Sequence, residues 1–366
     1  MIKRLELKGT PREIGEEHGR AGVKEIQNSL ETYEKLFFGY HRISWKEARE
    51  RALVHLKAIE AYDSDLIEEM EGVAVGAGVD FEDILTLNAR SEIALTGRKD
   101  IAFADGCTAI AVTPPASQDT IIGQNWDWKG SQIDSLLLLN IEQSDKPNIT
   151  MVTEGGIIGK VGFNSAGVAV CLNALITDKK SEEVPIHLGL RGVLNASSFH
   201  EAIAKVKDGQ MASTANFLMA SDEGDNRTMA ANVEVSPFGI DLLTNPEGTH
   251  VHTNHICSRS LMKKITDLNE FKYEDSMVRK QRAEQLMHSA LKTRPAINED
   301  CFKEWFSDQF NYPNSINHFP NEKAPEHRRS ETVFSIIMNL TRKRMFLCVG
   351  KPSSHQYVEV SSHALH

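Results

Sequence analysis

Asp105-Gly106-Cys107-Thr108 marks the position at which this 366-residue sequence changes from helical to strand-like patterns. Before it, the chain is rich in Glu, Lys and Arg, and Thr10-Pro11-Arg12-Glu13 is a capping box with proline at the first helical position. After it come short apolar runs separated by turn signals, which are typical of strands. The sequence therefore predicts a helical segment over residues 1–106 and a strand-rich part over residues 107–366, together one globular unit.

The order of the elements after this position predicts an α+β fold. Six short β runs lie within residues 107–172, helical patterns follow over residues 186–206, and a second strand-rich stretch covers residues 217–255. Two more helical stretches, over residues 273–291 and 298–306, precede two final strands. Runs of strands that alternate with blocks of helices favour helices packed on antiparallel sheets.

Composition excludes several classes of protein. The 51 acidic and 41 basic residues give a net charge of −10, and the chain has no basic block, which argues against a nucleic-acid partner. The longest apolar runs are too short to cross a bilayer, and no apolar segment of a secretory signal follows Met1. Five widely spaced cysteines without a CxxC pair predict reduced thiols and a cytoplasmic location.

A predicted hairpin brings a cysteine close to a carboxylate. Residues 113–117 read as its loop, and a loop centred on Ala116 would place Cys107 opposite Asn125, with Asp127 two residues beyond. By position alone, a cysteine that starts a strand is more often buried and inert. Asp127 by itself is as readily a turn residue.

The Gly106–Cys107 junction adds a specific chemistry. Glycine tolerates strained backbone conformations that expose its carbonyl to a neighbouring thiol. Attack of the Cys107 sulfur on the Gly106 carbonyl would form a thioester, and water would then release a new α-amine on Cys107. Because an α-amine has a reference pKa of about 8, it can act as the general base for the thiol of the same residue. The junction thus predicts self-cleavage between Gly106 and Cys107.

Several further short motifs are spread over almost the whole chain. The stretches that carry them are Gly9-Thr10-Pro11, Asp105-Gly106-Cys107-Thr108, Gly123-Gln124-Asn125-Trp126-Asp127, Val251-His252-Thr253-Asn254-His255 and, as the most specific, residues 156–170. Together they resemble the isopenicillin-N acyltransferase family, the acyl-coenzyme A:6-aminopenicillanic acid acyltransferase group of self-cleaving N-terminal nucleophile enzymes. The resemblance implies an αββα sandwich with a helical N-terminal pro-segment, a zymogen that is cleaved before Cys107.

The resemblance also implies a role for each of four residues. Cys107 matches the nucleophile, Asp127 the carboxylate beside it, Asn254 the oxyanion-hole asparagine and Arg329 the late active-site arginine. An Asn254 amide N–H aimed at a developing oxyanion would contribute about 3 kcal/mol. Asp127 would hold the protonated α-amine, and Arg329 would anchor Asp127 or a substrate carboxylate.

The implied substrate is a small acyl compound: an N-acyl amine, a penicillin-like amide or an acyl-coenzyme A. Neither a cofactor nor a metal is required, and the two fragments are expected to stay associated, while the oligomeric state is left open. Arg328 stands where penicillin-forming members carry a small residue, so penicillin specificity does not transfer. Acyl transfer and amide hydrolysis share one acyl-enzyme, which an amine or water resolves, and both reactions stay open.

Two other interpretations compete with this one. His250, His252 and His255 form an H-x-H-x-x-H pattern that suits a metal-dependent hydrolase, although no HExxH motif accompanies it. A cleavage-inactive relative with a binding role would keep the fold without the catalysis. Gly72, Gly76 and Gly78 lack the context of a phosphate loop and are predicted to mark helix ends.

Overall fold

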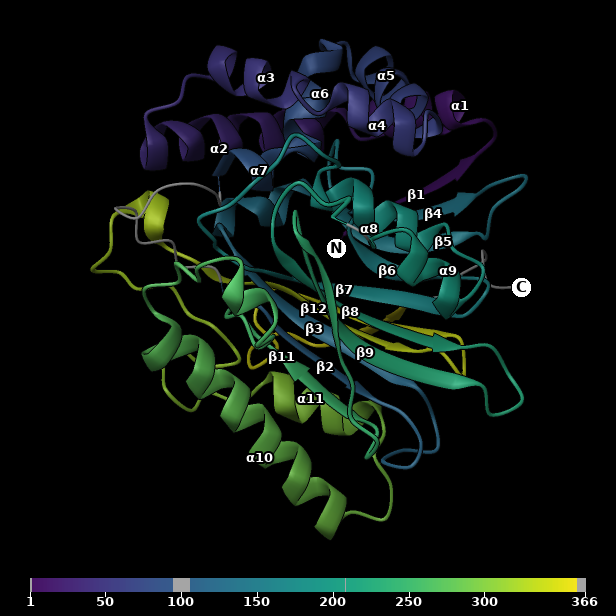
Figure 1. The fold of residues 1–366 in the computed structure, drawn as a ribbon, viewed down its shortest axis with the longest axis vertical. Coiled ribbons are helices and arrows are strands. Elements are labelled where there is room, and N and C mark those ends of the chain that lie inside the picture. The colour runs from purple at the N-terminus through teal and green to yellow at the C-terminus, as the bar shows by residue number, and fades with distance from the viewer. Residues whose placement is uncertain (1, 95–105, 208, 361–366) are drawn as a thin grey trace.

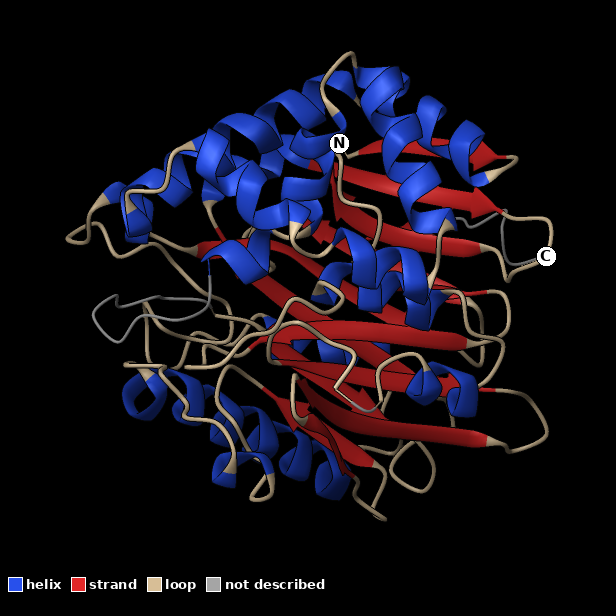
Figure 2. Ribbon diagram, turned by 45° about the horizontal axis from the view of Figure 1, so that its top comes forward, coloured by secondary structure: helices blue, strands red, loops and turns tan. Residues whose placement is uncertain are grey.

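Two stacked β-sheets form the centre of the fold in a computed structural model that describes residues 2–94, 106–207 and 209–360. Helices cover the outer sides of both sheets, so the layers follow the order α, β, β, α (Figure 1). Figure 2 shows the sheets as a continuous central block between the two groups of helices. The predicted α+β class and αββα sandwich are confirmed.

The larger sheet has eight strands in the order β1-β4-β5-β6-β7-β8-β9-β10. Its strands are β1 (Lys3–Lys8), β4 (Leu136–Glu142), β5 (Ile149–Glu154), β6 (Val161–Asn164), β7 (Val168–Ala174), β8 (Ala215–Asp222), β9 (Thr228–Ser236) and β10 (Gly239–Leu243). All pairs are antiparallel except β1 with β4, which is parallel. Helices α8 (Ile186–Leu194) and α9 (Phe199–Ala204) pack on this sheet.

The smaller sheet has six strands in the order β11-β2-β3-β12-β13-β14. Its strands are β2 (Thr108–Val112), β3 (Ile121–Trp128), β11 (Thr249–His252), β12 (Glu331–Asn339), β13 (Arg344–Val349) and β14 (Val358–Val360). Helices α10 (Met277–Thr293) and α11 (Glu299–Phe306) cover its outer face and enclose a core of their own with Ile110 and Ile337.

A glutamine on β3 joins the two sheets. The Gln124 side chain donates from Nε2 to the Leu172 carbonyl of β7 at 2.9 Å and accepts from the Leu172 N–H at 2.8 Å. Both residues are buried, and a buried amide that is satisfied on both sides fixes the relative position of the strands that carry it. This clamp lies on the strand that also carries Asp127.

The N-terminal segment is not helical throughout, as the sequence had led us to expect. The helices are α1 (Pro11–Ala21), α2 (Val23–His41), α3 (Trp45–Leu53), α4 (Leu56–Tyr62), α5 (Asp65–Ala77), α6 (Phe81–Asn88) and α7 (Arg90–Ala94). They follow β1, whose sequence KRLELK alternates polar and apolar residues, the period of a strand. Among the helices of the described residues, none combines the length and apolar character needed to cross a bilayer.

Helices α1 and α5 touch through their backbones. A Cβ on Gly15 would lie 2.0 Å from the Glu69 carbonyl oxygen, and one on Gly72 would lie 2.3 Å from the Arg12 carbonyl oxygen. The prediction that Gly72 and Gly76 mark helix ends was wrong, because both lie inside α5 and only Gly78 caps it. Their spacing of four residues places them on one face, where they permit the close approach.

We predict that Gly72→Ala lowers the free energy of unfolding by about 1–3 kcal/mol through overpacking. Alanine is the better helix former by about 1 kcal/mol, so any loss of stability reports the clash with α1. Denaturant unfolding measures the change, and Glu68→Ala, at an exposed position of the same helix, is the control. A Gly72→Ala protein as stable as the control would contradict the close packing.

Candidate active site

The hairpin after Gly106 forms as predicted, but its register differs by one residue. Thr108 pairs with Asn125 and Val112 with Ile121, so Cys107 comes opposite Trp126 rather than Asn125. The loop contains the eight residues 113–120, and an even loop has its centre between two residues instead of on Ala116. The shift places Cys107 closer along the sheet to Asp127.

Cys107 is only 2 % exposed, and its backbone is held from three directions. Its N–H donates to Asn254 Oδ1 at 2.8 Å. Its carbonyl oxygen accepts from Arg279 Nη1 at 2.8 Å and from Asn173 Nδ2 at 3.3 Å. The predicted nucleophile therefore sits on a main chain whose nitrogen and oxygen both have fixed partners.

Asn254 follows β11, which pairs with β2 and so brings it to Cys107. Its Oδ1 accepts from the Cys107 N–H and from Arg279 Nη2 at 3.1 Å, while its Nδ2 donates to the Ala174 carbonyl at 3.1 Å. These three contacts fix the orientation of the amide, because a flipped group would point N–H donors at two other donors. Asn254 is therefore in direct contact with the backbone of Cys107, and its oxyanion-hole role stays a prediction.

Arg279 on α10 is a residue that the sequence analysis did not identify. Its guanidinium is fully buried and bonds Cys107 O, Asn254 Oδ1 and, at 3.1 Å, Thr108 Oγ1. Its charge is balanced by Asp275, with Nε 2.5 Å from Oδ1. A planar group with five donors suits this task, since it binds several oxygens at once in fixed directions.

Asp127 lies beside Gly106. The Thr332 hydroxyl donates to its Oδ1 at 2.6 Å, and a Cβ on Gly106 would meet its Oδ2 at 3.1 Å. The same Cβ would lie 3.4 Å from the ring atom Nδ1 of His318. The backbone N–H of His318 donates to Thr332 Oγ1 at 2.9 Å. The predicted carboxylate is therefore present, but it faces the residue before Cys107, whereas Asn254 holds the Cys107 nitrogen.

Lys160 is a second buried cation near the site. Its ammonium is 2.6 Å from Glu154 Oε2 and 3.5 Å from the centre of the Trp126 ring. Burial lowers the pKa of Lys160 to about 8, although Glu154 works in the opposite direction. A charge on Cys107 has a smaller effect in the same direction as Glu154 on the pKa of Lys160.

Arg329 lies on the wall of a cavity of about 660 Å³. Its guanidinium is 2.9 Å from the Glu322 carboxylate and donates to the Ala324 carbonyl, so these contacts do not include Asp127. Lys129, which directly follows β3, lines the same cavity. Cys107, Asp127 and Asn254 are not among the described residues that line this cavity, and the role of Arg329 stays a prediction.

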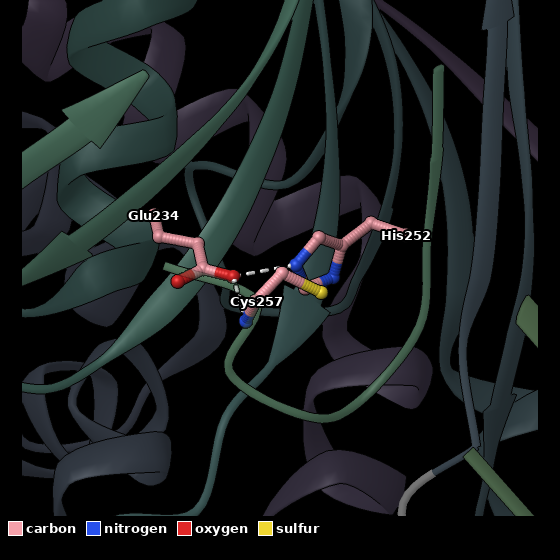
Figure 3. Close-up of side chains that lie close together, drawn as sticks. All are labelled: Glu234, His252 and Cys257. Atoms are coloured by element: carbon pink, nitrogen blue, oxygen red, sulfur yellow. Dashed lines mark hydrogen bonds and ion pairs between the residues drawn. The ribbon is translucent and has the colours of Figure 1, made fainter. Parts of the chain in front are cut away.

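The three histidines of the H-x-H-x-x-H pattern are not brought together as ligands. The one group of three potential metal ligands in the described part of the chain is Glu234, His252 and Cys257, whose ligand atoms lie within 4.8 Å of one another (Figure 3). His250 and His255 are not members of it. A three-histidine site is therefore not supported by these residues.

Glu234 and His252 form a buried ion pair that positions the turn after β11. His252 Nε2 is 2.8 Å from Glu234 Oε1 (Figure 3). Its Nδ1 is 2.8 Å from the Thr253 carbonyl. The carboxylate also accepts the backbone N–H groups of Cys257 and Ser258. Burial lowers the pKa of His252, but hydrogen bonds to Cys257 and Glu234 outweigh it and raise the pKa to about 10.

The missed residues differ in the signal that could have revealed them. Arg279 heads a stripe of buried positions on α10 that continues with Ala283, Met287 and Ala290, so a charge there points to a buried partner. Lys160 is the one charged residue within residues 156–170. His318 lies outside any helix or strand and has no periodic pattern around it, so sequence alone offers no signal.

We predict that Arg279→Leu lowers the free energy of unfolding by about 3–5 kcal/mol, because Asp275 would lose the partner of a buried ion pair. Arg282→Leu, one turn along α10, is the control: its pair with Asp308 is partly exposed and contributes about 1 kcal/mol or less. Denaturant unfolding compares the two variants. Equal losses would contradict the central position of Arg279.

The Glu234–His252 pair predicts a loss of stability in alkali. The folded pKa of His252 is about 10 and the unfolded one about 6.5, so its contribution is complete below pH 6.5 and disappears as the pH rises through 10. The stability advantage of wild type over Glu234→Gln should therefore shrink between pH 7 and pH 10. Urea midpoints at several pH values measure it, and a constant difference would refute the charged pair.

Comparison with known proteins agrees with the resemblance seen in the sequence. A sequence profile described as "AAT: Acyl-coenzyme A:6-aminopenicillanic acid acyl-transferase" matches residues 115–354. The chain is 33% identical over 349 residues to the acyl-coenzyme A:6-aminopenicillanic-acid-acyltransferase 40 kDa form of Emericella nidulans, a match that covers 94% of this chain and 92% of that protein.

Two solved structures show lower similarity. The N-acylethanolamine-hydrolyzing acid amidase ortholog of Caenorhabditis elegans has a TM-score of 0.44 and 16% identity over 64% of this chain and 93% of that one. A mutant of conjugated bile acid hydrolase from Clostridium perfringens has a TM-score of 0.45 and 12% identity over 70% of this chain and 97% of that one. The profile and the identity to the Emericella protein show that this chain belongs to the acyl-coenzyme A:6-aminopenicillanic acid acyl-transferase family and is an acyltransferase or amide hydrolase.

Proposed function

We propose that this protein cleaves itself between Gly106 and Cys107 and then makes or breaks acyl-amide bonds through a thioester on the Cys107 sulfur. The observation that supports this most directly is the hydrogen bond from the Cys107 N–H to Asn254 Oδ1. That nitrogen becomes the α-amine after cleavage. An α-amine held beside its own thiol is the arrangement that a self-activating N-terminal nucleophile requires.

The same contacts hold the new terminus after cleavage. Once the peptide bond to Gly106 is broken, Cys107 is tethered on one side only, and the order of its backbone depends on noncovalent contacts. Arg279 and Asn173 hold its carbonyl oxygen, and Asn254 holds its nitrogen. Such fixed partners keep the nucleophile oriented without a cost at the moment of reaction.

Turnover then follows from groups already in place. The α-amine accepts the thiol proton, and the sulfur attacks the acyl carbonyl of the substrate. Asn254 Nδ2 carries two hydrogens and donates one of them to Ala174, so the second is left for the oxyanion. The amine, or the thiol of coenzyme A, leaves with the proton, and water or an incoming amine resolves the thioester.

The cavity beside Arg329 is our candidate for the substrate site. The name of the Emericella relative gives acyl-coenzyme A and 6-aminopenicillanic acid as its substrates, and both are anions at neutral pH. Lys35, Lys129 and Arg329 line this cavity together with four glutamates, Glu31, Glu322, Glu326 and Glu331. We assign Arg329 to the binding of a substrate carboxylate or phosphate, through the fork of donors that suits such groups.

We also propose that the two fragments stay associated after cleavage. Strand β1 pairs with β4 over six residues, and α2 packs on β5 and against the turn that follows β3, so the N-terminal segment is part of the larger sheet and its cover.

The five cysteines form no disulfide, which supports a reducing compartment such as the cytoplasm.

Replacement of the nucleophile tests the proposal. Cys107→Ala should abolish turnover of acyl-coenzyme A, penicillin-like amides and N-acyl amines, because no thioester can form. Cys257→Ser is the matched control, since Cys257 is the one cysteine that is not buried, and it should keep wild-type turnover. Intact mass of the wild type with substrate should show an acyl adduct on Cys107.

Two results would contradict the proposal. Turnover by Cys107→Ala would remove the thioester from the mechanism. Activity that is lost with EDTA and restored by zinc would favour a metal-dependent hydrolase instead.

A further inference from the structure

We propose that His318 is the oxyanion donor of self-cleavage, so that maturation and turnover use different donors. In this assignment, the Nδ1–H of a neutral His318 stabilises the negative charge that develops on the Gly106 carbonyl oxygen. Asn254 serves only the later reaction with substrate. The inference rests on the proposed self-cleavage before Cys107 and names a residue that this step needs.

The geometry of the peptide bond excludes Asn254 from the first reaction. The Gly106–Cys107 bond is trans, so its carbonyl oxygen points away from its N–H. That N–H points at Asn254 Oδ1, 2.8 Å away. The Gly106 oxygen therefore lies on the side of the peptide opposite to Asn254. Arg279 is also committed, since it bonds the carbonyl oxygen of Cys107 rather than that of Gly106.

His318 is the buried polar group that lies against Gly106. A Cβ on Gly106 would be 3.4 Å from His318 Nδ1, so the ring packs against this residue, although Nδ1 makes no hydrogen bond to the Gly106 carbonyl oxygen in this structure. Nδ1 is buried and has no partner in hydrogen-bonding geometry among the described residues. The backbone of Ser315 lies near the ring but does not meet that geometry. An unpaired buried nitrogen is costly, and a role at the neighbouring peptide accounts for it.

The surroundings of His318 favour a neutral ring with the proton on Nδ1. Burial lowers the pKa of His318 to about 4, so the imidazole is neutral at physiological pH. Ser330 Oγ, 3.3 Å from Nε2, can donate to that nitrogen and leave the proton on Nδ1. A neutral imidazole is an effective oxyanion donor.

The position of the ring is set by the start of β12. The backbone N–H of His318 donates to Thr332 Oγ1, and the backbone N–H of Thr332 donates to the His318 carbonyl oxygen at 3.1 Å. The Thr332 hydroxyl itself donates to Asp127. Thr332 thus fixes the imidazole and the carboxylate relative to each other, with Gly106 against both. A Cβ at position 106 would press on Asp127 Oδ2 at 3.1 Å and would be in ordinary contact with His318 Nδ1 at 3.4 Å.

The proposed step is balanced with water as the only co-reactant. The Cys107 sulfur attacks the Gly106 carbonyl carbon, a C–S bond forms, and the carbonyl oxygen becomes an oxyanion that accepts from His318 Nδ1–H. The C–N bond then breaks, and the thiol proton moves to the Cys107 nitrogen. Water hydrolyses the resulting thioester, which leaves a carboxylic acid on Gly106 and the thiol and α-amine on Cys107.

Full-length variants produced by cell-free synthesis test the assignment, with cleavage followed over time on denaturing gels. His318→Asn keeps an N–H near the place of Nδ1 and should cleave within a few-fold of the wild-type rate. His318→Leu removes the donor and should cleave about 10²–10³-fold more slowly, as expected for the loss of one oxyanion donor. His355→Leu, at an exposed position away from the site, is the control.

A second readout separates this role from a structural one. Turnover, expressed per cleaved molecule, should be the same in His318→Leu as in wild type, because Asn254 serves that reaction. If His318→Leu does not fold, His318→Gln replaces it: the longer amide reaches the place of Nε2, and cleavage should again be slow while His318→Asn stays fast.

Each outcome has one meaning. Wild-type cleavage rates in His318→Leu, or equally slow cleavage in His318→Asn and His318→Leu, would overturn the assignment and leave the proposed function intact. A loss of turnover per cleaved molecule that matches the loss of cleavage would also overturn it. If the wild-type chain itself fails to cleave, the proposed function falls first.

Discussion

The buried guanidinium of Arg279 is the interaction on which the rest of the site depends. It bonds the carbonyl oxygen of Cys107 and the side-chain oxygen of Asn254, and Asp275 balances its charge. An unpaired ion of this kind would be very costly to bury, so the pair with Asp275 is what permits a positive charge behind Cys107, the proposed nucleophile. Helix α10, β2 and the turn after β11 are thereby tied to one point.

Each of the two sheets contributes different residues around Arg279. The smaller sheet carries Cys107, Asp127 and Thr332 at neighbouring positions of adjacent strands. The larger sheet contributes Asn173, whose side chain donates to the Cys107 carbonyl oxygen. The sandwich thus surrounds one backbone segment with partners from both sheets. This explains how a chain cleaved before Cys107 can keep its new terminus in place.

Sequence reasoning reached the elements that depend on local chemistry. The hairpin, its turn and the approach of Asp127 to the Gly106–Cys107 junction follow from β patterns and a proline-rich loop. The predicted register of this hairpin was off by one residue because its loop contains eight residues, so the centre of the loop lies between two residues and not on Ala116. Strand β1 was missed because six alternating residues precede a long helical pattern, and its partner β4 lies more than 130 residues away.

The partners of Cys107 were harder to predict. Asn254 came only through the resemblance to a family, since it lies 147 residues from Cys107. Arg279 and His318 come still later in the chain, and no local pattern joins them to Cys107. Their positions are set by how α10 and the start of β12 pack on the smaller sheet. That information is in the tertiary structure, and no motif carries it.

N-terminal sequencing of the purified full-length protein is the most direct measurement of the central claim. Our account predicts a second amino terminus that reads Cys-Thr-Ala-Ile-Ala, the sequence of residues 107–111, in equal amount to the first. A single terminus at Met1 that persists after prolonged incubation of folded protein, together with full enzymatic activity, would contradict it.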